Sequence, residues 1–492
     1  MTEEENKALV VRPSTAVGRV SAGAESVLSP IVSDALSRAR ARATALASAR
    51  FRIGNYEFGS PDYRQILLWS EALKIDPITV VQHLERASTV RWITSEISFR
   101  VDNGAIISVA WDFETLPLTS FEWVEGLSIC EIALQGLPGR PAPINDLSIH
   151  LPSLRRLIVV GVKLSALNLS VPELTELYCS DNQLSELDLS NVPKLSRLSV
   201  ISCPLAKLDL SSVPKLSELV CINNQLAKLD LSKVPELTRL DCNAKLTQLD
   251  LSGVPKLSEL LCSRSQLTKL DLSKVPELTR LHCSDNQLTK LDLANVPKLH
   301  ELGCSQNQLT ELDLSKVPAL KKLHCHVNQL AKLDLSKVPE LTRLDCDRNQ
   351  LTELDLSKVP ELASLECTGN QLTELDLANV PKLHELRCSQ NQQLTELHLS
   401  DLPELTELYC SDNQLTELDL SALPALTKLH CSGNQIAELD VRQNRKLKDL
   451  YCDPLVSIKK LPSQVVQNSP YAGLVLGSAF KSFMVGPRSS SD

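Results

Sequence analysis

The sequence predicts a mainly β, right-handed solenoid with one parallel sheet on its concave face and a small α+β cap at its N-terminus. Three observations predict this fold. A unit of about 21 residues, such as LTRLDCDRNQLTELDLSKVPE at residues 341–361, recurs fifteen times with small changes from Leu154 onward. Hydrophobic residues make up 43% of the chain but aromatic residues only 3%, so the core must be aliphatic. A core that grows by one repeat at a time also allows 492 residues to form one elongated body.

Residues 1–50 are rich in Ala, Ser and Arg and poor in large apolar side chains. We expect a disordered tail that forms a basic amphipathic helix transiently, because Leu28, Ile31 and Leu36 recur near helical spacing. Residues 25–48 are therefore a hypothetical segment for weak docking to a membrane surface or to a partner.

Residues 51–150 differ in composition, since they contain tryptophans and most of the phenylalanines. The stretch DYRQILLWSEALKIDPITVVQHLERA predicts two short helices separated at Pro77, and ISFRVDNGAIISVAWDF predicts two strands around an Asp-Asn-Gly turn. We interpret this part as an α+β cap that covers the open first coil of the array.

The repeat itself, L-x-x-L-x-C-x-x-N-x-L-x-x-L-D-L-S-x-V-P-x, occupies residues 151–460. Alternation in L-x-C places Leu and Cys on one side of a short strand, and stacked strands form a parallel sheet. The Pro that closes each unit excludes a helix on the returning side, so we expect extended or short 3₁₀ segments there. The Asn after each strand is expected to form an internal ladder of amides. Residues 461–492 are expected to be a weakly ordered tail.

The pattern L-x-x-L-x-[LC]-x-x-N-x-L over residues 154–452 resembles the leucine-rich repeat signature. Its 21-residue form with Cys in the strand resembles the cysteine-ladder branch of the internalin-like bacterial proteins. The resemblance implies a leucine-rich repeat solenoid that serves as a curved binding scaffold. Those relatives carry export signals and wall anchors, whereas this sequence shows neither pattern, and LPSQV at residues 461–465 is not a sorting motif.

Thirteen of the fifteen cysteines occupy the strand position of a repeat. Val159 and Val200 take that position in two units, which indicates a small buried hydrophobe rather than a ligand or nucleophile. We therefore expect reduced, buried thiols, with metal clusters, redox chemistry and ladder disulfides as the alternatives. Cys203 stands apart because it occupies the Asn position, where the turn loses an amide.

The residue before the second Leu of each unit alternates in sign over eight units, from Arg156 and Glu176 to Arg280 and Glu301. Each of these side chains would then have opposite charges on both neighbouring strands. We interpret the row as ion pairs that set the register, with ligand contact as the alternative.

The residue between the second Leu and Cys varies freely and faces outward on the concave side. We call these positions the outward row. Tyrosine and histidine cluster at its C-terminal end, and aromatic residues are common at binding hot spots. The predicted partner-binding residues are Tyr178, Asp241, His282, His324, Asp345, Glu366, Arg387, Tyr409, His430 and Tyr451.

Metal and catalytic sites are not predicted. The twelve aspartates of the LDLS motifs lack the Gly-rich loops of calcium-binding β-rolls and are expected to cap turns. His282, His300, His324 and His326 lie on neighbouring coils, but no spacing fixes a zinc site. No nucleophile elbow, phosphate loop or zinc-hydrolase motif is present, so we expect neither an enzyme nor a cofactor.

The net charge of −9 argues against a nucleic-acid partner. An apolar run long enough to span a membrane is absent, and the acidic N-terminus does not resemble a signal peptide, so we expect a cytoplasmic protein. The sequence thus predicts a non-enzymatic scaffold that binds a protein on its concave face. The alternative is a secreted or surface-associated effector or adhesin exported without a recognisable signal peptide.

Overall fold

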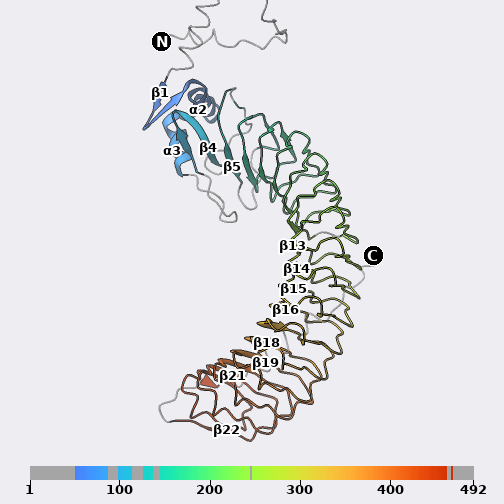
Figure 1. The fold of residues 1–492 in the computed structure, drawn as a ribbon. Helices are drawn as coiled ribbons and strands as arrows, with labels where there is room; N and C mark the ends of the chain where they lie inside the picture. The colour runs from blue at the N-terminus through green and yellow to red at the C-terminus, as the bar shows by residue number, and fades with distance from the viewer. Residues whose placement is uncertain are drawn as a thin grey trace, which may run out of the picture.

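The computed structural model describes residues 50–86, 98–113, 123, 126–136, 144–243, 246–461 and 467–468. The predictions for residues 1–49, including the docking segment at 25–48, lie outside this part of the chain, as does most of the predicted tail. The described repeats form an arch whose strands line the inner, concave side (Figure 1).

The N-terminal cap contains a hairpin, two helices and the first strands of the long sheet. Its elements are β1 (Arg50–Ile53), β2 (Tyr56–Gly59), α2 (Ser60–Leu73), α3 (Pro77–Arg86), β3 (Arg100–Asp102), β4 (Ala105–Asp112) and β5 (Glu131–Gln135). As predicted, the second helix begins at Pro77 and an Asp-Asn-Gly turn joins β3 to β4. The turn requires a left-handed backbone, with φ of 48° at Asn103 and 81° at Gly104.

A buried carboxylate fixes the helix of the cap to the sheet. Asp62 on α2 is 3% exposed and accepts a hydrogen bond of 2.8 Å from the backbone N–H of Ile106 on β4. The buried indoles of Trp69 on α2 and Trp111 on β4 also pack edge to face, 5.0 Å apart between ring centroids. Because β4 pairs in parallel with β5, and β5 with β7, the sheet of the array starts within these residues.

The array continues as one parallel sheet of short strands. These are β7 (Arg156–Val160), β9 (Glu176–Tyr178), β10 (Arg197–Ser199), β11 (Glu218–Val220), β12 (Arg239–Asp241), β13 (Glu259–Leu261), β14 (Arg280–His282), β15 (Glu301–Gly303), β16 (Lys322–His324), β17 (Arg343–Asp345), β18 (Ser364–Glu366), β19 (Glu385–Arg387), β20 (Glu407–Tyr409), β21 (Lys428–His430), β23 (Asp449–Tyr451) and β25 (Gln467–Asn468). The register pairs equivalent residues of successive repeats, such as Leu281 with Leu302.

The convex side consists of extended segments and tight turns. Most repeats close two successive turns by hydrogen bonds between residues three apart, for example Val192 N–H to Leu189 O and Leu195 N–H to Val192 O. These are isolated β-turns, and no 3₁₀ helix occurs in the described repeats, so of the two predicted forms the convex side takes the extended one. At the two ends of the array the convex segments pair as small parallel sheets: β6 (Asp146–Ile149) with β8 (Ala166–Leu169), and β22 (Glu438–Asp440) with β24 (Ser457–Lys459).

The core contains rows of leucine, valine and cysteine that are almost completely buried. All fifteen cysteines are free thiols, and only Cys130, outside the array, is partly exposed. Burial raises the pKa of Cys221, Cys283 and Cys388 to about 12. A thiol with such a pKa stays protonated and unreactive at neutral pH. The predicted burial of the cysteine ladder is confirmed.

The asparagine ladder is also confirmed. Asn307 donates from Nδ2 to the carbonyls of Cys283 and Cys304, both at 3.0 Å, and accepts at Oδ1 from the N–H of Leu288 at 3.0 Å. Each amide therefore satisfies backbone groups of its own coil and of the preceding one. In the unit with Cys203, the thiol takes over part of this role, since its Sγ lies 3.2 Å from the carbonyl oxygen of Cys179.

Candidate functional site

The ten predicted site residues each occupy the last position of a strand in the one sheet. Register places His324, Asp345, Glu366, Arg387, Tyr409, His430 and Tyr451 side by side on seven successive strands. The other three are separated from this run: Tyr178 lies next to Ser199, and Leu261 stands between Asp241 and His282. Only the C-terminal part of the outward row therefore forms a continuous surface.

Aromatic rings pack against each other at the C-terminal end of the row. The ring centroids of Tyr409 and His430 are 4.6 Å apart, and those of His430 and Tyr451 are 4.1 Å apart. The guanidinium of Arg387 lies 4.2 Å from the centroid of Tyr409, a cation–π contact. We call these four residues the aromatic strip. Burial lowers the pKa of His430, which favours a neutral imidazole between the two tyrosines.

Charged neighbours hold the aromatic strip in place. The Tyr409 hydroxyl donates to Glu407 at 2.8 Å, and Lys428 Nζ lies 2.9 Å from the same carboxylate. Arg387 pairs with Glu385 at 2.7 Å. The strip is thus a preorganised surface of half-buried rings with ionic groups along one side, an arrangement that can bind a protein side chain at low entropic cost.

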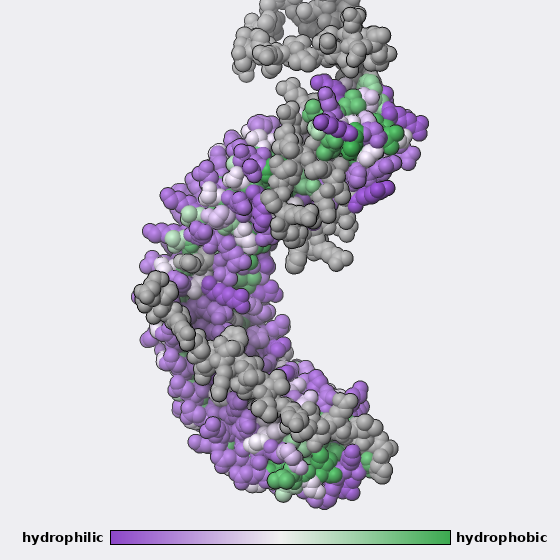
Figure 2. Space-filling view, turned by 180° about the vertical axis from the view of Figure 1, so that it is seen from behind, coloured by the Kyte–Doolittle hydropathy of each residue, from purple (hydrophilic) through white to green (hydrophobic). Residues whose placement is uncertain are grey.

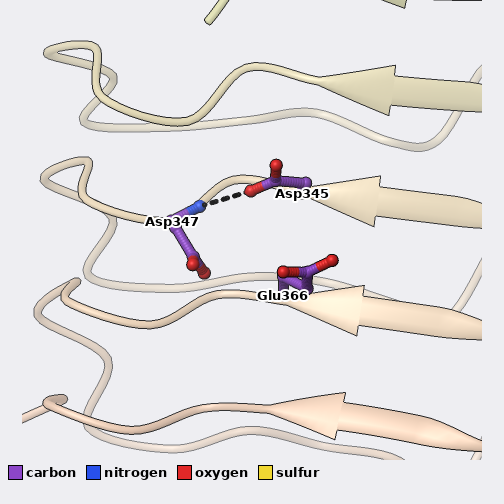
Figure 3. A group of neighbouring side chains, drawn as sticks. All are labelled: Asp345, Asp347 and Glu366. Carbon is purple, nitrogen blue, oxygen red and sulfur yellow. Dashed lines mark hydrogen bonds between the residues drawn. The ribbon is translucent and has the colours of Figure 1, made fainter. Parts of the chain in front are cut away.

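A group of acids and imidazoles lies at β16 to β18, next to the aromatic strip. Asp345 is 8% exposed, and its Oδ2 lies 2.7 Å from Nδ1 of His326 and 3.6 Å from Nδ1 of His324. Asp347 and Glu366 complete the group, with carboxylate oxygens of all three acids within 4.8 Å of one another (Figure 3). We call these five residues the acid–imidazole cluster.

The electrostatics of this cluster follow from its packing. Burial opposes ionisation of Asp345, but the contacts with His324 and His326 hold its pKa well below the usual value. The contact with Asp345 in turn raises the pKa of His326. Burial and the nearby carboxylates of Asp345 and Glu366 raise the pKa of Asp347 to about 7. Asp347 therefore changes its charge near neutral pH.

Carboxylates and imidazoles are possible cation ligands, but Glu366 already pairs with Arg343 at 3.2 Å and Arg387 at 3.9 Å. The cluster is thus balanced by basic side chains of this chain. The sequence analysis did not predict Asp347 as a site residue. A signal existed, since most repeats carry Ser or Thr at that position.

The charge row and the LDLS aspartates have the predicted structural roles. In the charge row, Arg239 lies 3.4 Å from Glu218 and 2.6 Å from Glu259, on the strands at either side. On the convex side, Asp313 accepts at Oδ1 from the N–H of Ser315 at 2.8 Å, which lowers its pKa. The same turn-capping bond recurs at Asp188, Asp209, Asp230, Asp250, Asp271, Asp334, Asp355 and Asp419.

Comparisons with known proteins agree with this geometry. A family model described as leucine-rich repeats (two copies) matches residues 276–316 and 403–462. The functional domain of InlJ from Listeria monocytogenes, which includes a cysteine ladder, is 38% identical, with a TM-score of 0.57. That match covers 58% of this chain and 64% of the InlJ chain, so it spans less than two thirds of that relative. A comparison with curated proteins found no match.

Two further solved structures share the fold. YopM from Yersinia enterocolitica WA-314 is 26% identical, with a TM-score of 0.51 over 73% of this chain and 90% of that one. The plant peptide hormone receptor RGFR1 is 17% identical, with a TM-score of 0.50 over 77% of this chain and 72% of that one, a likeness of fold alone.

The chain is therefore a leucine-rich repeat protein with the solenoid fold that the repeats predicted. Its 21-residue units and buried thiols make it internalin-like, of the cysteine-ladder type. Neither helix in the described part of the chain combines the length and the apolar character that crossing a membrane needs.

Proposed function

We propose that this chain is a non-enzymatic scaffold that binds a protein partner on the concave face, close to the C-terminal end of the sheet. The observation that carries this proposal is the aromatic strip. It gathers two tyrosines, a histidine and an arginine on four successive strands, in a protein with only 3% aromatic residues. Tyr and Arg are enriched among residues that dominate binding energy.

The surroundings of the strip support the proposal. Hydrophilic residues dominate the described surface of the repeats in the view of Figure 2. Rings that keep one edge exposed among fixed charges offer both apolar contact and hydrogen bonds. A solved structure of the same fold, the plant receptor RGFR1, is in complex with RGF2.

Site-specific photo-crosslinking tests the location of the partner. A benzophenone amino acid placed at Tyr451 should crosslink a protein from cell extract, because Tyr451 lies at the end of the strip. The matched control carries the same group at Lys337, an exposed convex residue. Equal crosslinking from both positions, or none from Tyr451, would contradict concave binding.

A second function is supported by the relatives. InlJ and YopM are bacterial proteins, and YopM from Yersinia pestis is described as a leucine-rich effector protein. A secreted or surface-associated role would place the same concave face outside the cell that makes it, whereas the first proposal expects a cytoplasmic partner. Fractionation of the producing cell distinguishes them: protein in the medium or on the surface supports the second role, and retention in the cytoplasm supports the first.

A further inference from the structure

A cavity lies on the turns that follow strands β18 to β21, around the one unit of the array that is longer than 21 residues. The unit that starts at Leu383 ends before Leu405 and has 22 residues, and the extra one lies in NQQL at residues 391–394. The cavity has a volume of about 810 Å³. Small-molecule sites usually have about 300 to 1,000 Å³.

Two glycines widen this cavity. Gly369 and Gly433 adopt a left-handed backbone, with φ of 69° and 71°. Other repeats place a side chain at this turn position, for example Arg348 and Asp412. A Cβ added at Gly433 would collide with the carboxylate of Asp412. The space therefore arises from one inserted residue and two glycines. Other repeats lack these features and keep the same fold, so the scaffold does not require them.

Amides dominate the lining. Exposed glutamine side chains surround the cavity, namely Gln371, Gln390, Gln392, Gln393 and Gln414. Among these five glutamines, only Gln414 makes a side-chain hydrogen bond to another described residue: its amide donates to the carbonyl of Gln392. Asn370 and Asn413 also line the cavity, but their amides belong to the internal ladder. The other four glutamines keep their donors and acceptors for a ligand.

This lining selects the chemistry of the ligand. Asp412 is its one charged residue, so an anion such as phosphate would meet a negative charge and no cation. Hydrophobic and aromatic side chains are also absent among the lining residues of this described region, so an apolar ligand gains little. A hydroxyl group both donates and accepts, as an amide side chain does, so hydroxyl-rich ligands match the lining.

We propose that this cavity binds a neutral saccharide. The cavity lies on the turns after the strands, and none of its lining residues belongs to the aromatic strip. The proposal is therefore independent of the protein partner proposed above. An extended peptide also carries donors and acceptors, but its apolar side chains would find no counterpart among glutamines and asparagines. Since the cavity is open and is lined by polar residues and glycines, we expect weak binding, with Kd on the order of 1 mM.

Saturation-transfer difference NMR on the full-length protein tests this proposal with chitotriose, maltotriose and lactose as probes and the tetrapeptide Gly-Gln-Ser-Gly for comparison. We expect transfer to at least one saccharide. Deletion of Gln393 restores a 21-residue unit and should abolish the signal. The double substitution Gln371→Ala and Gln414→Ala keeps the 22-residue unit, removes two lining amides and should raise Kd by about fivefold or more, a change of about 1 kcal/mol.

The matched control replaces Gln287 and Gln308, which occupy the equivalent position on turns of ordinary length, by alanine. It should bind like the unmodified protein. If circular dichroism shows that the deletion variant does not fold, the double substitution alone tests whether the cavity binds the saccharide. Absence of transfer to every saccharide, an equal loss in the control, or stronger transfer to the peptide than to any saccharide would each overturn the proposal.

Discussion

Between β9 and β15 the concave sheet is a regular scaffold, whereas between β16 and β23 the same scaffold carries unusual side chains. In the first region arginine and glutamate alternate as ion pairs, and the outward row lacks a continuous aromatic or acidic group. In the second region the acid–imidazole cluster and the aromatic strip occupy adjacent strands. Because the core is the same in both, core packing does not require the difference, and the proposed function attributes it to recognition.

The largest predicted effect is common to both regions. Asn286→Ala and Asn413→Ala each remove an amide that makes three hydrogen bonds to buried backbone groups. We expect each to lower the free energy of unfolding by about 2 to 4 kcal/mol, since those groups lose their partners. Urea denaturation followed by circular dichroism measures it. A clearly smaller loss in one region would show that the scaffolds differ.

The cysteine row should respond in the same way in both regions. Cys283→Ser and Cys388→Ser place a hydroxyl in an apolar core and should cost about 1 to 3 kcal/mol. The matched variants Cys283→Val and Cys388→Val should cost less, because Val200 already occupies this position and is fully buried. The same urea experiment checks the order, and serine variants as stable as valine variants would contradict a purely apolar role.

The second region should show a pH dependence that arises from Asp347. The pKa of Asp347 in the folded protein is raised from 3.8 to about 7. The folded state therefore holds this proton more tightly than the unfolded state, and the associated stability is lost as pH rises through 7. Asp347→Ser, which restores the common repeat residue, should be more stable than the unmodified protein at pH 8 by about 1 to 3 kcal/mol. Near pH 4 the advantage should disappear.

The control for this experiment is Asp355→Ser, because hydrogen bonds with Ser357 lower the pKa of Asp355. Its stabilising effect is present above the unfolded pKa and is lost as pH falls, so this variant should lose stability at pH 8 rather than gain it. Thermal melts between pH 4 and pH 8 compare the two. A pH-independent difference for Asp347→Ser would refute the raised pKa.

The smallest effect is expected in the first region. Arg239→Gln removes the ion pairs with Glu218 and Glu259. These side chains are partly exposed, so the loss of stability should stay below about 1 kcal/mol and shrink further in 1 M salt. A loss that salt does not reduce would indicate a packing role instead. Urea denaturation at low and high salt separates the two.

The repeat predicted most of the fold, because a pattern copied fifteen times reports directly which positions are buried. The Leu, Cys and Asn rows all lie where their spacing placed them. The extent of the sheet was harder to predict, since β4 and β5 lack the repeat pattern although they pair with the array and share its core.

The candidate site was only partly predictable. Tyr409, His430 and Tyr451 stood out because aromatics are rare in this sequence, but their ring contacts depend on strand register. Asp347 lies after the strand, so its proximity to Glu366 depends on how one turn packs on the next coil. The cavity could not be predicted, because the sequence shows the extra residue of the 22-residue unit but not the geometry of its turn.

The measurement that tests the central claim most directly is the affinity of the crosslinked partner for three proteins: unmodified, Tyr409→Ala with Tyr451→Ala, and Tyr178→Ala. Isothermal titration calorimetry provides it. We predict that the double variant loses about tenfold or more in affinity and that Tyr178→Ala, in the same row but in the first region, binds normally. Unchanged affinity of the double variant, or an equal loss with Tyr178→Ala, would contradict a recognition surface confined to the C-terminal part of the sheet.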